Sequence, residues 1–148
     1  EKVWDIRDKE HEFLQEVTRT LANKTGAVAI SATDSGDYFI SGYANILDMP
    51  EFFDIDLTKA LLTAIDEFEC FRLLFEAVGQ DEDIQVLMGE ELGPGLAGPY
   101  GFVFKRYVTP RKTGGEIGVI GPTRLNYTYV VPTVRYFGNL IEEVARGW

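Results

Sequence analysis

The chain has 148 residues, a length that one folded domain accommodates around a single hydrophobic core. Its 45% hydrophobic and 13% aromatic residues exclude a disordered chain, because this composition can bury enough apolar surface to offset the entropy lost on folding. Its 24 acidic and 14 basic residues give a net charge of −10, which repels a phosphate backbone and excludes direct DNA binding by this chain alone.

Cysteine usage and hydropathy predict a soluble, cytoplasmic protein. Cys70 is the only cysteine, so no internal disulfide can form, and we expect its thiol to be buried as a small hydrophobic group. No apolar run approaches the ~18 to 20 residues that cross a bilayer, and no signal-peptide pattern opens the chain. Because the first residue is Glu1, we expect the sequence to be part of a longer protein.

The N-terminal third predicts a helix followed by a β-hairpin. Apolar residues recur every three or four positions from Asp5 to Lys24, as on one face of an amphipathic helix, and Gly26 ends this pattern. Two segments rich in β-branched and aromatic residues, Ala27–Thr33 and Tyr38–Tyr43, flank the glycine-containing turn Asp34–Asp37. They are predicted to pair as antiparallel strands.

A connector and a long helix are predicted next. The segment Asn45–Asp56 contains Pro50 and several aspartates, which favour an ordered connector packed by its apolar residues. Asp56 is predicted to cap a helix with a broad apolar stripe that runs to Val78, and Gly79 closes it.

The C-terminal half predicts three more strands. Asp83–Met88 is a short strand, and the glycines and proline of Gly89–Gly95 dictate a loop. Tyr100–Thr109 and Glu116–Ile120 are predicted to pair around a turn at 110–115.

A final helix completes the predicted order of elements. Asn126 can cap this helix, which runs to about Arg146, and Pro132 predicts a kink or an irregular start. The order predicts an α+β fold for residues 1–148 as a single domain. We expect a GAF-like or PAS-like antiparallel sheet of about five strands, with long helices covering one face.

Two motifs resemble those of the HrcA family of heat-inducible transcription repressors. Residues 42–52 read Gly-Tyr-Ala-Asn-Ile-Leu-Asp-Met-Pro-Glu-Phe, and residues 118–127 read Gly-Val-Ile-Gly-Pro-Thr-Arg-Leu-Asn-Tyr. The turn Gly89-Glu90-Glu91 between them is similar to the family's Gly-Glu-Glu. The resemblance covers roughly Gly42 to Val144.

The resemblance implies a regulatory and dimerisation domain of a repressor of chaperone operons, and not an enzyme. Family members carry a winged-helix DNA-binding domain, a GAF-like domain and a dimerising insert within the latter, whereas this sequence shows only the second. It therefore implies a homodimer that reaches operator DNA only through a winged-helix domain absent here. It also implies a GroE-type chaperonin as a partner that helps to maintain the active state.

Two groups of residues are candidate sites. Gly121, Pro122, Thr123, Arg124 and Asn126 lie between a strand and a helix start, where backbone N–H groups and a guanidinium could hold an anion or an acidic effector. A structural Gly-Pro turn, with Arg124 paired to a carboxylate, would use the same residues. The second group is the family-motif connector, which comprises Asn45, Leu47, Asp48, Pro50 and Phe52.

No catalytic, cofactor or metal site is predicted. Asp48, Glu51, Asp54 and Asp56 lack the spacing of an EF-hand loop, so we interpret them as a solvated turn that supplies helix caps. Glu90 and Glu91 are adjacent on a turn, where two carboxylates rarely converge on one substrate atom. The single histidine, His11, lies among charges and is interpreted as a surface residue.

Two further clusters are given structural interpretations. The basic residues Lys105, Arg106, Arg111 and Lys112 are interpreted as a solvated strand end. The aromatic residues Tyr100, Phe102, Phe104 and Tyr107 are expected to pack against the helices, with the even positions on one face. If they instead line a pocket, the alternative function is a free-standing GAF-like small-molecule sensor.

Overall fold

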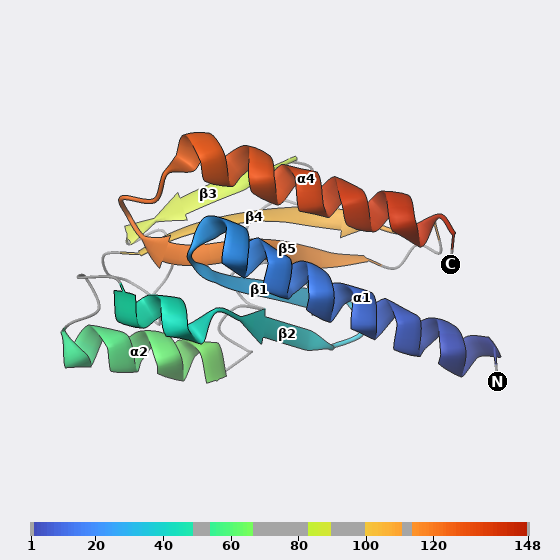
Figure 1. The fold of residues 1–148 in the computed structure, drawn as a ribbon, viewed down its shortest axis with the longest axis horizontal. Coiled ribbons are helices and arrows are strands. Elements are labelled where there is room, and N and C mark those ends of the chain that lie inside the picture. The colour runs from blue at the N-terminus through green and yellow to red at the C-terminus, as the bar shows by residue number, and fades with distance from the viewer. Residues whose placement is uncertain (1, 49–53, 67–82, 90–99, 111–113, 148) are drawn as a thin grey trace.

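The computed structural model describes residues 2–48, 54–66, 83–89, 100–110 and 114–147, shown as a ribbon in Figure 1. In chain order its elements are α1 (Lys2–Thr25), β1 (Val28–Thr33), β2 (Tyr38–Ser41), the 3-10 helix η1 (Tyr43–Asp48), α2 (Ile55–Asp66), β3 (Gln85–Met88), β4 (Tyr100–Val108), β5 (Gly114–Pro122) and α4 (Tyr127–Ala145). In this part of the chain, no helix is both long and apolar enough to cross a membrane.

The five described strands form one antiparallel sheet with the order β2-β1-β5-β4-β3. The hairpin β1–β2 follows from its short glycine-containing turn, as predicted; β4 and β5 also pair antiparallel as predicted, and β5 lies between β1 and β4. This arrangement confirms the predicted α+β, GAF-like fold class. Every residue of β1 and β5 is buried, because both faces of these central strands are covered.

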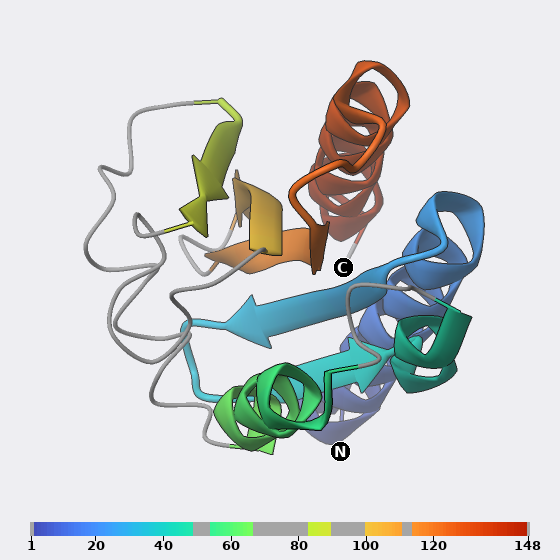
Figure 2. The same cartoon turned by 90° about the vertical axis from the view of Figure 1, so that its left-hand side faces the viewer.

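Helices α1 and α4 lie side by side over one face of the sheet (Figures 1 and 2). The apolar stripe of α1 buries Leu14, Val17 and Leu21. The hydroxyl oxygens of Thr18 on α1 and Ser31 on β1 are 2.7 Å apart, which fixes the helix over the sheet. Helix α4 buries a matching stripe: Val130, Val134, Phe137, Gly138 and Ile141.

The N-terminus of α2 differs from the sequence prediction. The helix begins at Ile55, and its capping residue is Asp54 and not Asp56. The Asp54 carboxylate accepts a hydrogen bond from the Asp56 N–H at 2.9 Å, and the Asp54 carbonyl accepts one from the Thr58 N–H at 3.0 Å. Asp54 and Asp56 lie on either side of Ile55, and either side chain could cap a helix that starts here. The sequence therefore does not show which of them is the cap. The predicted continuation of this helix beyond Asp66 lies outside the described residues.

Helix α4 runs from Tyr127 to Ala145 without interruption, so the irregular start expected at Pro132 is not observed. A proline there removes only the bond to the carbonyl four residues earlier, and buried residues on both sides hold the helix in place. Asn126 occupies the capping position, but its side chain makes no capping hydrogen bond. Its carbonyl oxygen accepts hydrogen bonds from the N–H groups of Tyr129 and Val130 instead.

Candidate functional site

The predicted effector loop joins the end of β5 to α4. Gly121 and Pro122 are buried at the end of the strand, whereas Thr123 and Arg124 are exposed in the turn. The Leu125 N–H donates to the Pro122 carbonyl at 3.1 Å, which closes the turn. The structure thus places all five candidate residues, Asn126 included, on one short connection.

The loop is held in place by side chains that pack over two glycines of the sheet. The Tyr127 hydroxyl donates to the Thr123 carbonyl at 2.8 Å, and burial raises the pKa of this phenol. A Cβ on Gly101 would lie 2.3 Å from the Tyr127 Oη, and one on Gly121 would lie 2.9 Å from a methyl carbon of Leu125. Because Gly101 and Gly121 are partners in the β4–β5 register, together they leave room for the start of α4. An effector role for the loop stays a prediction.

The family-motif connector is anchored by Asn45. Its side-chain amide donates to the carbonyls of Ala27 at 2.8 Å and of Ala22 at 3.4 Å, so it ties η1 to the junction between α1 and β1. Gly42 precedes it with a φ of +93°, and a Cβ there would lie 2.6 Å from the Ala27 carbonyl oxygen. This crowding explains a glycine at that position.

The other connector residues are placed only in part. Leu47 and Asp48 end η1, and Asp48 is exposed. Pro50 and Phe52 lie outside the described residues, as do Glu51, Cys70, Glu90, Glu91, Arg111 and Lys112.

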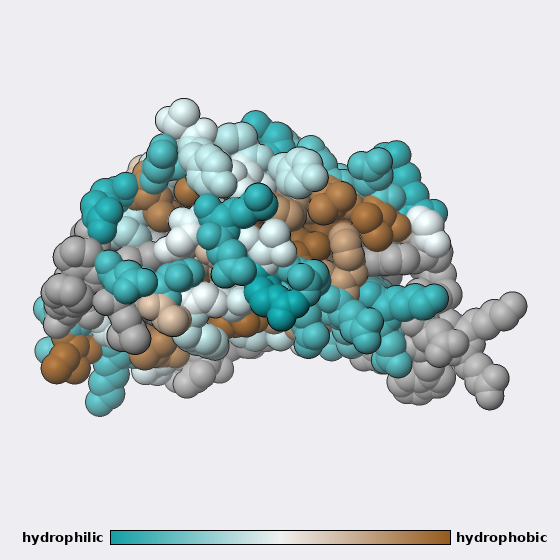
Figure 3. Space-filling view, viewed as in Figure 1, coloured by the Kyte–Doolittle hydropathy of each residue, from teal (hydrophilic) through white to brown (hydrophobic). Residues whose placement is uncertain are grey.

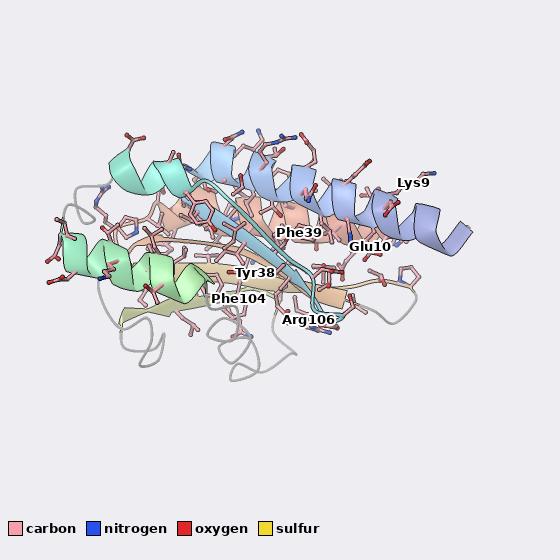
Figure 4. All side chains as sticks on the ribbon, turned by 90° about the horizontal axis from the view of Figure 1, so that it is seen from below. Lys9, Glu10, Tyr38, Phe39, Phe104 and Arg106 are labelled. Atoms are coloured by element: carbon pink, nitrogen blue, oxygen red, sulfur yellow. The ribbon has the colours of Figure 1, made fainter. Side chains whose placement is uncertain are left out.

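Arg106 corrects the interpretation of the basic cluster as a solvated strand end. Its guanidinium lies 2.6 Å from the Asp34 carboxylate and 2.8 Å from that of Glu116. These contacts, led by the hydrogen bond to Asp34, raise the pKa of Arg106, while burial raises the pKa of Glu116. Figure 4 shows Arg106 near the β1–β2 turn, which the guanidinium connects to β4 and β5.

Lys105 is also buried, and its side chain is only 7% exposed. Its ammonium nitrogen lies 3.5 Å from an Asp83 oxygen and 3.8 Å from a Glu142 oxygen, and its stem packs under Gly138 of α4. Arg135 on α4 also contacts Asp83, at 2.7 Å, and this hydrogen bond is the main reason why the pKa of Asp83 is lowered. The charges therefore join α4, β4 and the segment that leads into β3.

His11 is half-buried and not a free surface residue. Its Nε2 lies 2.8 Å from an Asp37 carboxylate oxygen, and its ring packs edge-on against Phe39 at 5.6 Å between centroids. It links α1 to the β1–β2 turn. Its partner lies 26 positions away along the chain, a contact that the sequence does not reveal.

The strand aromatics divide between the two faces of the sheet. Lys105 packs under α4, so strand alternation places Phe102 and Phe104 on the opposite face, where they stack at 4.8 Å and are 0% and 3% exposed. Tyr107 is buried on the helix side, near Gly115 and the charge of Glu10. All four aromatic residues are buried, as expected for core packing, and Phe102 and Phe104 share one face as predicted. The sensor alternative stays a prediction.

The described residues include no group of three or more potential metal ligands. Grooves lie beside both α1 and α4. A groove of about 680 Å³ lies between α1 and β2, lined by Glu12, Gln15, Glu16, Thr18, Arg19, Tyr38, Phe39, Ile40 and Ser41. A second, of about 480 Å³, lies beside α4 and is lined by Lys24, Thr128, Tyr129, Pro132, Thr133, Tyr136 and Phe137. The sequence analysis did not single out this second surface, although Tyr129 and Tyr136 fall off the core stripe of their helix.

Solved structures with a similar fold include the following two. One is a crystal structure of a hypothetical protein, with a TM-score of 0.63 and 19% identity, which covers 74% of this chain and 32% of that chain. The other is Myxococcus xanthus MglB, with a TM-score of 0.51 and 14% identity, which covers 90% of this chain and 95% of that one. At these identities the likeness concerns the fold alone.

Sequence relatives carry the functional information. The repressor HrcA of Geobacter sulfurreducens is 32% identical over 114 residues, which cover 77% of this chain and 33% of the relative. That of Syntrophobacter fumaroxidans is 28% identical over 141 residues, which cover 95% of this chain and 40% of the relative. Both are described as heat-inducible transcription repressors and not as enzymes, and this chain spans only a third to two-fifths of their length.

The family model for the HrcA protein C-terminal domain matches residues 1–131. Together with the two motifs and the sheet order, this match shows that the chain belongs to the C-terminal domain family of the heat-inducible transcription repressor HrcA.

Proposed function

We propose that this domain regulates and assembles an HrcA-type repressor by pairing with a second copy of itself, while other parts of the protein contact DNA. A repressor that reads an inverted-repeat operator requires a two-fold symmetric protein. The relatives are two and a half to three times as long as the matched region, which leaves room in them for a separate DNA-binding part. The domain would then set the spacing of the attached DNA-binding arms.

Electrostatics supports a role away from the DNA. The chain carries a net charge of −10. Two of its basic side chains, Lys105 and Arg106, are held among carboxylates and are not available to neutralise phosphates.

An uncharged surface on α4 supports protein contact and is the observation that carries the proposal. Tyr129 and Tyr136 are 46% and 61% exposed on the side of the helix that faces away from the sheet. In Figure 3 the surface over the N-terminal half of α4 is mostly pale, whereas that over α1 is mostly teal. Exposed tyrosines are enriched in protein interfaces because they combine a large apolar area with a polar group.

Self-association and DNA binding can be measured separately on the 148-residue chain. Sedimentation equilibrium between micromolar and millimolar concentrations is expected to give a reversible dimer. Fluorescence anisotropy with an inverted-repeat duplex at 150 mM salt is expected to show no binding. A chain that stays monomeric at millimolar concentration contradicts the assembly role, and tight binding to the duplex contradicts the separation of roles.

Regulation would act on the population of the folded, dimer-competent state. A domain whose free energy of unfolding is about 5 to 15 kcal/mol can lose a measurable folded fraction on heating, and a partner that binds the native state raises that fraction. Differential scanning fluorimetry, with and without an excess of a GroE-type chaperonin, tests this step. A domain that remains folded to very high temperature would contradict thermal sensing.

A further inference from the structure

The exposed side of α4 carries a group of residues, here called the tyrosine stripe, that consists of Tyr129, Pro132, Thr133 and Tyr136. We propose that two copies of the chain dock through this stripe, with their α4 helices antiparallel across a two-fold axis beside Pro132 and Thr133. The inference rests on the self-association proposed above and adds the surface and its geometry.

The spacing of the stripe is suited to helix packing. Tyr129, Pro132, Thr133 and Tyr136 recur at intervals of three or four residues, so they share one side of the helix. The residues between them on the core side, Val130 and Val134, are buried against the sheet. The stripe also lines the 480 Å³ groove beside α4, to which Phe137 and Lys24 contribute. A partner ring therefore has an apolar recess to enter.

Charge favours this surface over the α1–β2 groove for contact between two acidic chains. The segment from Tyr127 to Ile141 contains a single charged residue, Arg135, and its guanidinium is paired with Asp83 at 2.7 Å. The groove between α1 and β2 is lined by Glu12, Glu16 and Arg19, and because Arg19 pairs with Glu16, it keeps one net negative charge from Glu12. Two copies that met there would bring carboxylates together, whereas the tyrosine stripe brings together uncharged side chains.

The symmetry of the stripe predicts the antiparallel arrangement. A two-fold axis beside Pro132 and Thr133 places Tyr129 of one copy against Tyr136 of the other, and the same contact recurs on the opposite side of the axis. The two tyrosines of one helix are about 10.5 Å apart along its axis at 1.5 Å per residue. Pro132 and Thr133 are small enough for the helices to approach to the usual ~8 to 10 Å.

A parallel arrangement is disfavoured by the acidic end of the helix. Glu142 and Glu143 follow the stripe on the last turn of α4. Parallel helices would set these carboxylates beside those of the second copy, whereas the antiparallel arrangement keeps the two Glu143 side chains about 30 Å apart at 1.5 Å per residue. Antiparallel helices also align their dipoles favourably.

Disulfide cross-linking tests the axis directly, in a Cys70→Ser background so that only introduced thiols react. Thr133→Cys, next to the axis, is expected to give a covalent dimer on mild oxidation. Tyr129→Cys and Tyr136→Cys are each expected to cross-link poorly alone and to form a heterodimer when mixed, because only the mixture brings the two thiols within disulfide range. Gln15→Cys, exposed on α1, is the control and should stay monomeric.

A charge substitution gives an independent measurement. Tyr136→Glu is expected to weaken dimerisation at least ~10-fold, since it buries a carboxylate in an interface between acidic chains. Tyr43→Glu is the control, because Tyr43 is likewise an exposed tyrosine, at 46%, but lies on η1, and dimerisation of this variant should be unchanged. Circular dichroism confirms that each variant is folded.

The outcomes separate this inference from the broader proposal. A dimer that shows the expected cross-links, and that Tyr136→Glu weakens, supports both. A dimer that lacks the Thr133→Cys and mixed cross-links overturns the tyrosine stripe as the interface and leaves self-association in place. A chain that stays monomeric at millimolar concentration overturns both.

Discussion

Replacing Arg106 by methionine tests whether the charge cluster at the end of the sheet stabilises the fold. Methionine keeps the apolar stem but removes the guanidinium, which leaves Glu116, with a side chain only 12% exposed, without its 2.8 Å partner. Removing one partner of a buried ion pair typically costs about 3 to 5 kcal/mol. Since Asp34 is 44% exposed and can be solvated, we expect a loss at the lower end, about 3 kcal/mol at pH 7.

The loss should depend on pH in a defined direction. Burial already raises the pKa of Glu116, and the variant removes the Arg106 contacts that lower it, so this pKa rises further. A folded-state pKa above the unfolded value means that the folded chain holds the proton more tightly. The resulting stabilisation is present at low pH and is lost as the pH rises through the folded pKa. The variant should therefore be closer to the wild type at pH 5 than at pH 7.

Urea denaturation followed by circular dichroism at both pH values measures these differences. The double variant Arg106→Met, Glu116→Gln is the control, because a neutral amide needs no counter-charge, and it should recover at least about half of the loss. If the single variant loses less than about 1 kcal/mol at pH 7, or if the double variant is no more stable than the single one, the cluster does not stabilise the fold as argued.

Three further substitutions test local features, each by urea denaturation. Asn45→Ala removes two hydrogen bonds to backbone carbonyls and should cost about 1 to 3 kcal/mol; an unchanged midpoint would contradict the anchoring role of Asn45. Gly118→Ala should cost more than ~2 kcal/mol, because its Cβ would lie 2.3 Å from the Val103 carbonyl oxygen; full stability would show that the sheet can shift. Asp54→Ala should cost about 1 kcal/mol, whereas Asp56→Ala should cost less; the reverse order would restore Asp56 as the cap.

Much of the fold follows from local patterns. The apolar spacing of Leu14, Val17 and Leu21 defines the buried face of α1, and the short glycine-containing turn between β1 and β2 defines that hairpin. These features depend on residues within a few positions of one another, so the sequence alone predicts them. The HrcA resemblance could be found in the same way, because each of its two motifs is a run of consecutive residues.

The charge cluster could not be predicted because its partners are distant in sequence. Arg106 contacts Asp34 across 72 positions, and without that contact a run of basic residues is most simply interpreted as a solvated end. Which face of the sheet Phe102 and Phe104 occupy could not be predicted for a related reason. Alternation shows that they share a face, but only the assembled sheet shows which face α4 covers. The candidate loop at Gly121 was located correctly, although the packing of Tyr127 over Gly101 was not foreseen.

The carboxylate of Asp83 has a consequence for how the molecule opens. It precedes the edge strand β3 and contacts both Arg135 on the final helix and Lys105 on the neighbouring strand. If α4 separates from the sheet, Asp83 loses its ion pair with Arg135, which holds the start of β3 in place. If β3 separates instead, the buried Lys105 ammonium loses Asp83 as a counter-ion. We therefore expect edge strand and final helix to exchange their amide hydrogens as one cooperative unit, so that whatever docks on the helix also slows exchange at the sheet edge.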